Sequence, residues 1–115
     1  MEEFLKPPVA QLVREIDAVN HAWKVAAEFG DIPQLAESLK EMKSRLQVRL
    51  LRLHAPDRVY LELDEETESS EPLYDLRLRE PVAGRTDAAH LPVRVANEIL
   101  SPEEIEQFKS SLKNL

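Results

Sequence analysis

Three arginines, Arg45, Arg49 and Arg52, follow one another at separations of four and three residues and are called the arginine stripe below. On a helix this spacing gathers the three side chains within an arc of about 60°. A guanidinium binds carboxylates and phosphates through paired hydrogen bonds, so the stripe could bind an acidic protein surface or a nucleic-acid backbone. Two other interpretations stay open: a solvated flank whose aliphatic stems cover the core edge, and ion pairs with an acidic segment of the same chain.

The acidic residues of the chain are concentrated close to this basic segment. Residues 62–75 hold seven acidic side chains and no basic one, whereas residues 40–58 hold six basic and two acidic ones. The formal net charge of -7 conceals this polarity. Within the acidic segment, Glu65, Glu66 and Glu68 are candidates for binding a partner. Because phosphate contacts require a positive surface, the overall charge disfavours general nucleic-acid binding.

Residue types that carry catalysis or bind metals are sparse. The histidines, His21, His54 and His90, lack the helical spacing and carboxylate partner of the zinc helix motif. The acidic segment lacks the pattern of a calcium loop, and without cysteine the chain has no thiolate. We therefore predict no catalytic residue, no metal site and no cofactor. An enzyme would need a pocket of perturbed titratable groups around His54, Asp57 or His90.

Two long helices are expected in the first half of the chain. Apolar residues at separations of three and four predict a helix at 8–29, which Gly30 ends. A second helix is predicted at 32–54, because its apolar residues share an arc of about 80°. These residues are Ile32, Leu35, Leu39, Met42, Leu46, Leu50 and Leu53. The short connection predicts that the two helices form an antiparallel hairpin.

The period of the apolar pattern changes to two after the second helix. Residues 58–64 and 73–80 alternate and predict a two-stranded β-hairpin at 58–80 with a solvated acidic loop. The edge at 73–79 would be free to bind a partner. We expect irregular chain next, followed by two short helices within 91–114. The second of these begins with the capping-box pattern of Ser101 and Glu104.

These elements predict one α+β domain of residues 1–115 in the order α-α-β-β-α-α. The N-terminus lacks the basic and apolar regions of a signal peptide, and no apolar run reaches membrane-spanning length. We expect a cytoplasmic protein without a membrane partner. A two-stranded sheet and a helical hairpin leave apolar surface uncovered, so we also predict a homodimer through the long helices.

Four residues of the first helix are candidates for the dimer interface: Val13, Ile16, Asn20 and Trp23. Asn20 is polar within an apolar face, a position where asparagine can fix oligomeric state. Trp23 suits either the core or an interface anchor.

The leading functional hypothesis is a non-enzymatic protein-binding module, such as an adaptor, an assembly factor or a regulator. Charge polarity without a catalytic constellation supports it. One alternative is a nucleic-acid-associated regulator that binds through the arginine stripe. Another is a small enzyme of unknown reaction.

Overall fold

A computed structural model describes residues 7–30 and 33–109 of the chain. Its elements are α1 (Val9–Phe29), α2 (Pro33–His54), β1 (Val59–Asp64), β2 (Leu73–Val82), β3 (Arg85–Pro92), α3 (Val93–Ile99) and α4 (Pro102–Phe108). The α+β class, the helical hairpin and the two short C-terminal helices are confirmed. Residues 110–114 of the predicted last helix lie outside the described ranges. Among the helices of the described ranges, none combines the length and apolar character needed to cross a membrane.

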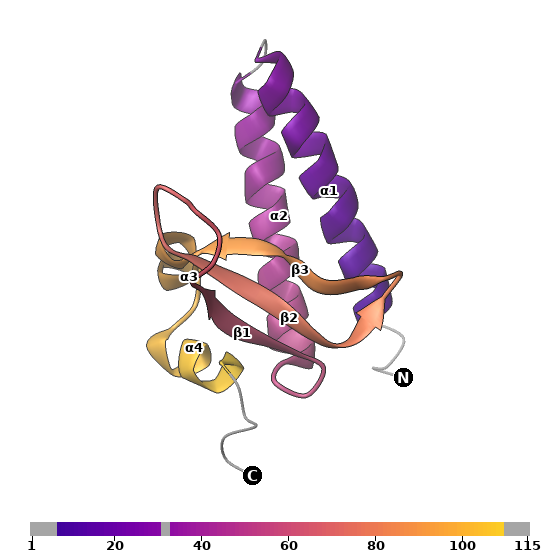
Figure 1. The fold of residues 1–115 in the computed structure, drawn as a ribbon, viewed down its shortest axis with the longest axis vertical. Helices are drawn as coiled ribbons and strands as arrows, with labels where there is room; N and C mark the ends of the chain where they lie inside the picture. Colours follow the sequence, from indigo (N-terminus) through magenta and orange to yellow (C-terminus); the bar gives the residue numbers. More distant parts are fainter. Residues whose placement is uncertain (1–6, 31–32, 110–115) are drawn as a thin grey trace.

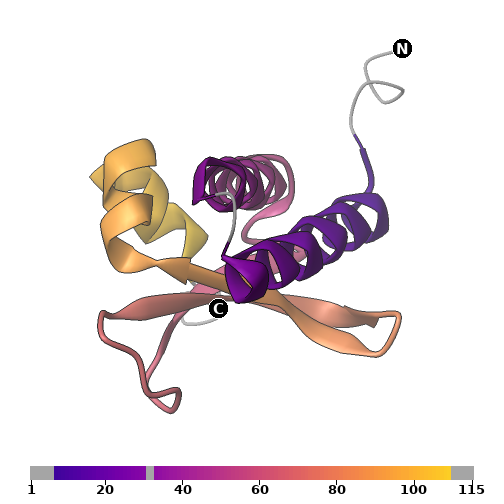
Figure 2. The ribbon, with the colours of Figure 1, turned by 90° about the horizontal axis from the view of Figure 1, so that it is seen from above.

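The molecule has a helical layer over one face of an antiparallel sheet with strand order β1-β2-β3. Figure 2 shows all four helices of the described residues on the same side of the sheet, which leaves the other face open. Figure 1 shows the α1–α2 hairpin crossing the sheet and extending well beyond it, with α3 and α4 beside the hairpin at one end. This layering determines which side chains meet in the core and which stay at the surface.

The core lies between the sheet and the parts of α1 and α2 that cover it. Side chains that alternate along β1 and β2 face the helices, because successive residues of a strand point to opposite faces. The largest fully buried side chains are Leu12, Ile16, Gln47, Leu50, Leu51, Val59, Leu61, Leu76 and Leu91. Of the apolar stripe predicted on the second helix, Leu35 and Met42 are 45% and 49% exposed. They lie on the part of the hairpin that extends beyond the sheet.

The sheet has a third strand, which the sequence analysis missed when it expected irregular chain between the β-hairpin and the last helices. β3 joins β2 through a two-residue turn in which Ala83 and Gly84 have φ angles of 50° and 80°, as a tight hairpin turn requires. Ala88 and Ala89 are both buried, and Ala89 has a φ of 66°. This irregularity interrupts the alternation that identifies a strand, which is why the pattern was missed.

The position of β2 corrects a second expectation. The predicted free edge at 73–79 lies in the middle of the sheet, paired with β1 on one side and with β3 on the other. The free edges therefore belong to β1 and β3. Gln47 of α2 covers part of the β3 edge, because its Nε2 donates to the carbonyl oxygens of Ala88 at 2.9 Å and His90 at 3.1 Å. Carbonyls two residues apart along a strand point to the same side.

The capping box of α4 is confirmed. Ser101 Oγ accepts a hydrogen bond from the Glu104 amide at 3.1 Å, and Glu104 Oε1 accepts one from the Ser101 amide at 3.0 Å. Glu104 also accepts a hydrogen bond of 2.9 Å from Arg52 Nε of α2. The start of α4 is thus tied to the end of the helical hairpin.

Candidate functional site

The arginine stripe does not meet the acidic loop that precedes β2. Arg52 binds Glu104 and, at 3.3 Å, the carbonyl oxygen of Ile99. Arg45 lies 3.3 Å from Glu41 of its own helix. Arg49 is exposed and makes no hydrogen bond or ion pair with any described residue. The three arginines therefore differ in role: Arg52 links α2 to the start of α4, Arg45 forms a surface ion pair, and Arg49 is solvated.

The acidic candidates Glu65, Glu66 and Glu68 lie in the exposed loop between β1 and β2. Their side chains make no ion pair within the described residues. Glu71, at the end of this loop, does pair: its Oε1 lies 3.2 Å from Nε of Arg94 on α3. The loop is thus held at its end and exposes its other carboxylates to solvent.

The four interface candidates of α1 separate into two pairs. Val13 and Ile16 are 2% and 1% exposed and lie in the chain's own core, which makes them unavailable to a second copy in this conformation. Asn20 and Trp23 lie farther along α1 and line a groove. Dimerisation itself stays a prediction.

The groove is a hollow of about 800 Å³ bounded by α1, α2, β3, α3 and the end of the acidic loop. Its apolar lining consists of Trp23, Leu73, Ala89, Pro92, Val95 and Ile99. Its basic lining consists of Lys24, Lys40, Lys43, Arg45, Arg85 and Arg94. Its acidic lining consists of Glu37, Glu41, Glu71, Asp87 and Glu98.

The arginines of the groove are neutralised within the chain. Arg45 pairs with Glu41, Arg85 pairs with Asp87 and Asp17, and Arg94 pairs with Glu71 and Glu98. By contrast, Lys24, Lys40 and Lys43 form no ion pair within residues 7–30 and 33–109. The basic side chains of the groove that lack an ion pair within the described residues are therefore its lysines, which we call the lysine cluster; Glu37 is a lining carboxylate that also lacks one.

Lys43 is the most buried member of the lysine cluster, with 9% of its surface exposed. Its Nζ donates a hydrogen bond of 3.1 Å to Asn20 Oδ1 and lies 5.2 Å from the centre of the Trp23 ring. Burial lowers the pKa of Lys43 to about 8, and repulsion from Lys24 and Lys40 contributes. A neutral amide and an aromatic ring stabilise the ammonium group without balancing its charge.

The sequence analysis counted Lys40 and Lys43 only as parts of the basic segment. The signal for a site was present in the helix itself, since Lys43, Ser44 and Gln47 place polar groups at adjacent positions of one face. All three are buried against the rest of the chain. Without the direction in which α2 crosses the sheet, the sequence could not show that this face is turned inward.

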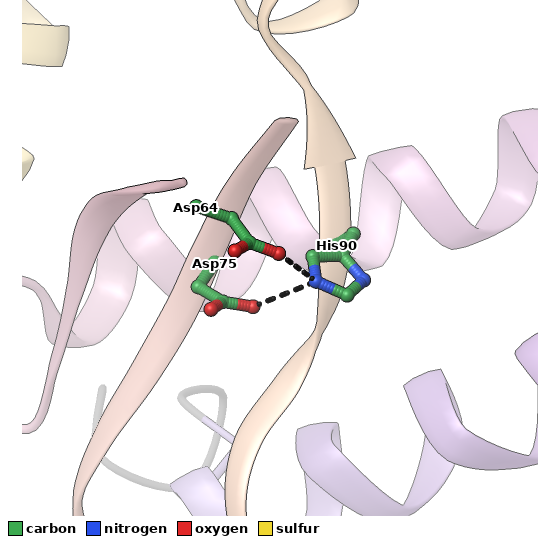
Figure 3. A group of neighbouring side chains, drawn as sticks. All are labelled: Asp64, Asp75 and His90. Carbon is green, nitrogen blue, oxygen red and sulfur yellow. Dashed lines mark hydrogen bonds and ion pairs between the residues drawn. The ribbon is translucent and has the colours of Figure 1, made fainter. Parts of the chain in front are cut away.

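A second group of side chains lies close to one end of the groove. His90 Nε2 is 2.7 Å from Asp64 Oδ2 and 3.1 Å from Asp75 Oδ1, as Figure 3 shows. Asp75 and His90 are cross-strand partners, and Asp64 ends the neighbouring strand. Strand alternation places Asp75 and His90 on the face opposite the core residues Tyr74 and Leu76. These three residues, called the Asp–Asp–His cluster below, could hold a metal ion.

The two carboxylates of the Asp–Asp–His cluster have opposite pKa shifts. Hydrogen bonds from the Thr67 side chain and from the Glu66 and Thr67 amides hold the pKa of Asp64 well below its usual range. Burial raises the pKa of Asp75, although His90 opposes this effect. The sequence analysis named His90 as a possible enzyme residue but missed both partners, because the cluster depends on the pairing of β2 with β3.

The other groups named for an enzyme do not join this cluster. His54 Nε2 lies 2.8 Å from the carbonyl oxygen of Pro7, at the opposite end of α2 from the hairpin tip. Asp57 is exposed in the turn that follows.

Comparison with known proteins gave no match, whether with protein-family models, with curated proteins or with solved structures.

Proposed function

We propose that the protein is a non-enzymatic binding module that holds an acidic segment of a partner protein in the groove between α1, α2, β3 and α3. The observation that carries the proposal is Lys43. Its ammonium group is buried at the groove, beside two other lysines, without a carboxylate partner among the described residues. A buried charge without a counter-ion destabilises the fold. An anionic group of a ligand would supply that counter-charge.

The lining of the groove favours a protein segment over a nucleic acid. Trp23, Val95 and Ile99 offer apolar contacts to the partner's side chains on either side of its acidic residue. A nucleic-acid backbone is best bound by many unpaired cations along a surface, and the arginines here are paired internally. The net charge of -7 also opposes a polyanion at long range.

The mode of binding follows from the state of the β3 edge. Gln47 already occupies the carbonyl oxygens of Ala88 and His90, so an added strand cannot pair there without displacing it. The partner segment would therefore bind through its side chains, with a carboxylate at Lys43 and an apolar group against Trp23. This mode of binding differs from recognition by strand addition, in which a peptide pairs with a sheet edge through its main chain.

The proposal is tested with a fluorescein-labelled peptide of alternating glutamate and leucine, followed by fluorescence anisotropy at low ionic strength. We expect Lys43→Gln to weaken binding about tenfold, because a buried charge pair is lost. Arg49→Gln is the matched control, since it removes the same charge from the same helix outside the groove. We expect this control to bind within about twofold of the original chain.

Three outcomes would contradict the proposal. The first is equal weakening in Lys43→Gln and Arg49→Gln, which would assign the signal to general charge. The second is saturable binding of a single-stranded oligonucleotide, but not of the peptide, that depends on the arginine stripe. The third is the absence of peptide binding by a chain whose circular dichroism shows the expected helix and strand content.

A further inference from the structure

We propose that Asp64, Asp75 and His90 bind a divalent transition-metal ion, with Zn²⁺ as the representative probe. The site borders the groove, since His90 also lines it, but the proposal does not depend on the function proposed for the groove. It adds a ligand class that the sequence patterns did not predict.

Two carboxylates converge on one nitrogen of His90. A ring nitrogen carries at most one hydrogen, so His90 Nε2 cannot donate a full hydrogen bond to both Asp64 and Asp75. Yet an oxygen of each carboxylate lies within 3.1 Å of that nitrogen. Two anionic oxygens and one imidazole nitrogen directed at a common point form a donor set for a cation.

The distances between the ligand atoms are somewhat shorter than those around a bound ion. Zinc binds histidine nitrogen and carboxylate oxygen at about 2.0 to 2.2 Å in tetrahedral geometry, so neighbouring ligand atoms lie about 3.3 to 3.6 Å apart. The separations from His90 Nε2 to the two carboxylate oxygens are 2.7 and 3.1 Å, and the three ligand atoms all lie within 4.8 Å of one another. The two separations from His90 are shorter than tetrahedral ones by about 0.2 to 0.9 Å, so rotation of the side chains would have to move the ligand atoms apart by that amount to accommodate the ion.

The fold holds the three ligands in place. Asp75 and His90 face each other across a strand pair, so the sheet register fixes their separation. Asp64 is oriented through its other oxygen, because Oδ1 accepts hydrogen bonds from the amides of Glu66 at 2.9 Å and Thr67 at 3.1 Å. Oδ2 remains directed at the cluster. Outer hydrogen bonds of this kind orient the carboxylates of metal sites.

The donor set also indicates the class of metal. Calcium and magnesium prefer oxygen donors alone, whereas an imidazole nitrogen with carboxylate oxygens suits zinc, manganese or iron. A divalent ion would balance the charge of the two carboxylates beside a neutral imidazole. The side chain of His90 is 39% exposed and that of Asp64 only 6%, so a bound ion would have an open side on the histidine side of the cluster.

The competing explanation is a protonated His90 that forms ion pairs with the two carboxylates and binds no metal. Isothermal titration of ZnCl₂ into the full chain, after treatment with a chelator and desalting, separates the two. We expect saturable binding of one ion per chain. Asp75→Asn should weaken zinc binding at least about tenfold. Loss of a residue that only orients a metal ligand already lowers metal affinity by about that factor, and Asp75 would be a ligand itself.

Asp75→Asn is suited to the test because it nearly preserves shape and the polar contact of Asp75 is with His90. His21→Asn is the matched control, because His21 is an exposed histidine away from the cluster and should leave the affinity unchanged. Lys43→Gln should also bind zinc normally, so failure of the groove proposal and failure of this one are distinguishable. Circular dichroism verifies that each variant is folded.

A second measurement identifies the ligand directly. In nitrogen-15 NMR, zinc should shift the Nε2 resonance of His90 and leave those of His21 and His54 in place. Absence of saturable heat together with an unmoved His90 resonance would overturn the proposal. Binding that survives Asp75→Asn unchanged would overturn it as well, because the signal would then come from surface carboxylates.

Discussion

Lys43 shows how one residue can influence both stability and binding. Its pKa of about 8 lies below the ordinary value of 10.5, so the folded chain releases this proton at a lower pH than the unfolded chain does. Between these two values the unfolded chain binds more protons, and the free energy of unfolding therefore rises with pH. Below about pH 8, the charged lysine destabilises the fold relative to a neutral side chain.

From this we predict that Lys43→Met stabilises the free protein at neutral pH. The gain should be on the order of 1 to 2 kcal/mol, after allowance for solvent that screens the partly open groove. The variant should also lose the rise in stability between pH 8 and 10.5. Urea unfolding at several pH values measures both effects. Parallel pH profiles for the variant and the original chain would contradict the assigned burial of this charge.

At this scale the sequence identified basic residues of the right segment, of which Arg45 lines the groove while Arg49 and Arg52 lie outside it. The helical spacing of the arginine stripe suggested one shared binding surface. In the structure, Arg52 instead holds α4 and Arg45 pairs with Glu41. Whether a cation is neutralised depends on acids that come from distant elements, such as Glu104. Spacing along one helix carries no information about those partners.

At the scale of elements, the hydrogen bonds between α2 and β3 could not be predicted from the sequence pattern. Gln47 is fully buried and donates to two carbonyl oxygens of β3, while its own Oε1 has no partner among the described residues. The helix thereby covers a strand edge that would otherwise be open for pairing with another chain. It also fixes β3 beneath the groove, so the position of His90 depends on this contact.

We predict that Gln47→Met, which has a similar shape, lowers the free energy of unfolding by about 2 kcal/mol. Two buried carbonyls lose their donor, and the removal of one unpaired oxygen offsets part of that loss. Gln34→Met, at an exposed position of the same helix, is the control and should change stability by less than about 0.5 kcal/mol. Urea unfolding decides the result. Equal stability of the two variants would show that the helix does not hold the strand edge.

The elements recovered from the sequence are those with uninterrupted patterns. Both long helices begin and end within about a residue of the predicted bounds, since the apolar period and Gly30 mark them. β3 was missed because Ala88 and Ala89 break the alternation. The Asp–Asp–His cluster was missed with it, since Asp75 and His90 become neighbours only through the register of that strand.

At the scale of the whole molecule, the hairpin tip is the large feature without a covering layer. The end of α1 and the start of α2 extend beyond the sheet, as Figure 1 shows. Their exposed apolar residues are Val25, Phe29, Leu35 and Met42, at 39%, 71%, 45% and 49% exposure. A homodimer through the long helices would use this surface, because Val13 and Ile16 are already covered by the chain's own sheet.

We therefore predict that two copies associate through their hairpin tips, which would bury apolar side chains in a four-helix arrangement. Multi-angle light scattering should give twice the chain mass at high concentration. Phe29→Ser with Leu35→Ser should give a monomer that keeps its circular dichroism spectrum, because neither side chain lies in the core. Leu63→Ser is the control, since Leu63 is 49% exposed on β1 away from the tip and should leave the dimer intact. A monomer at every concentration would contradict the predicted homodimer, and dimer loss in the Leu63 control would move the interface to the sheet.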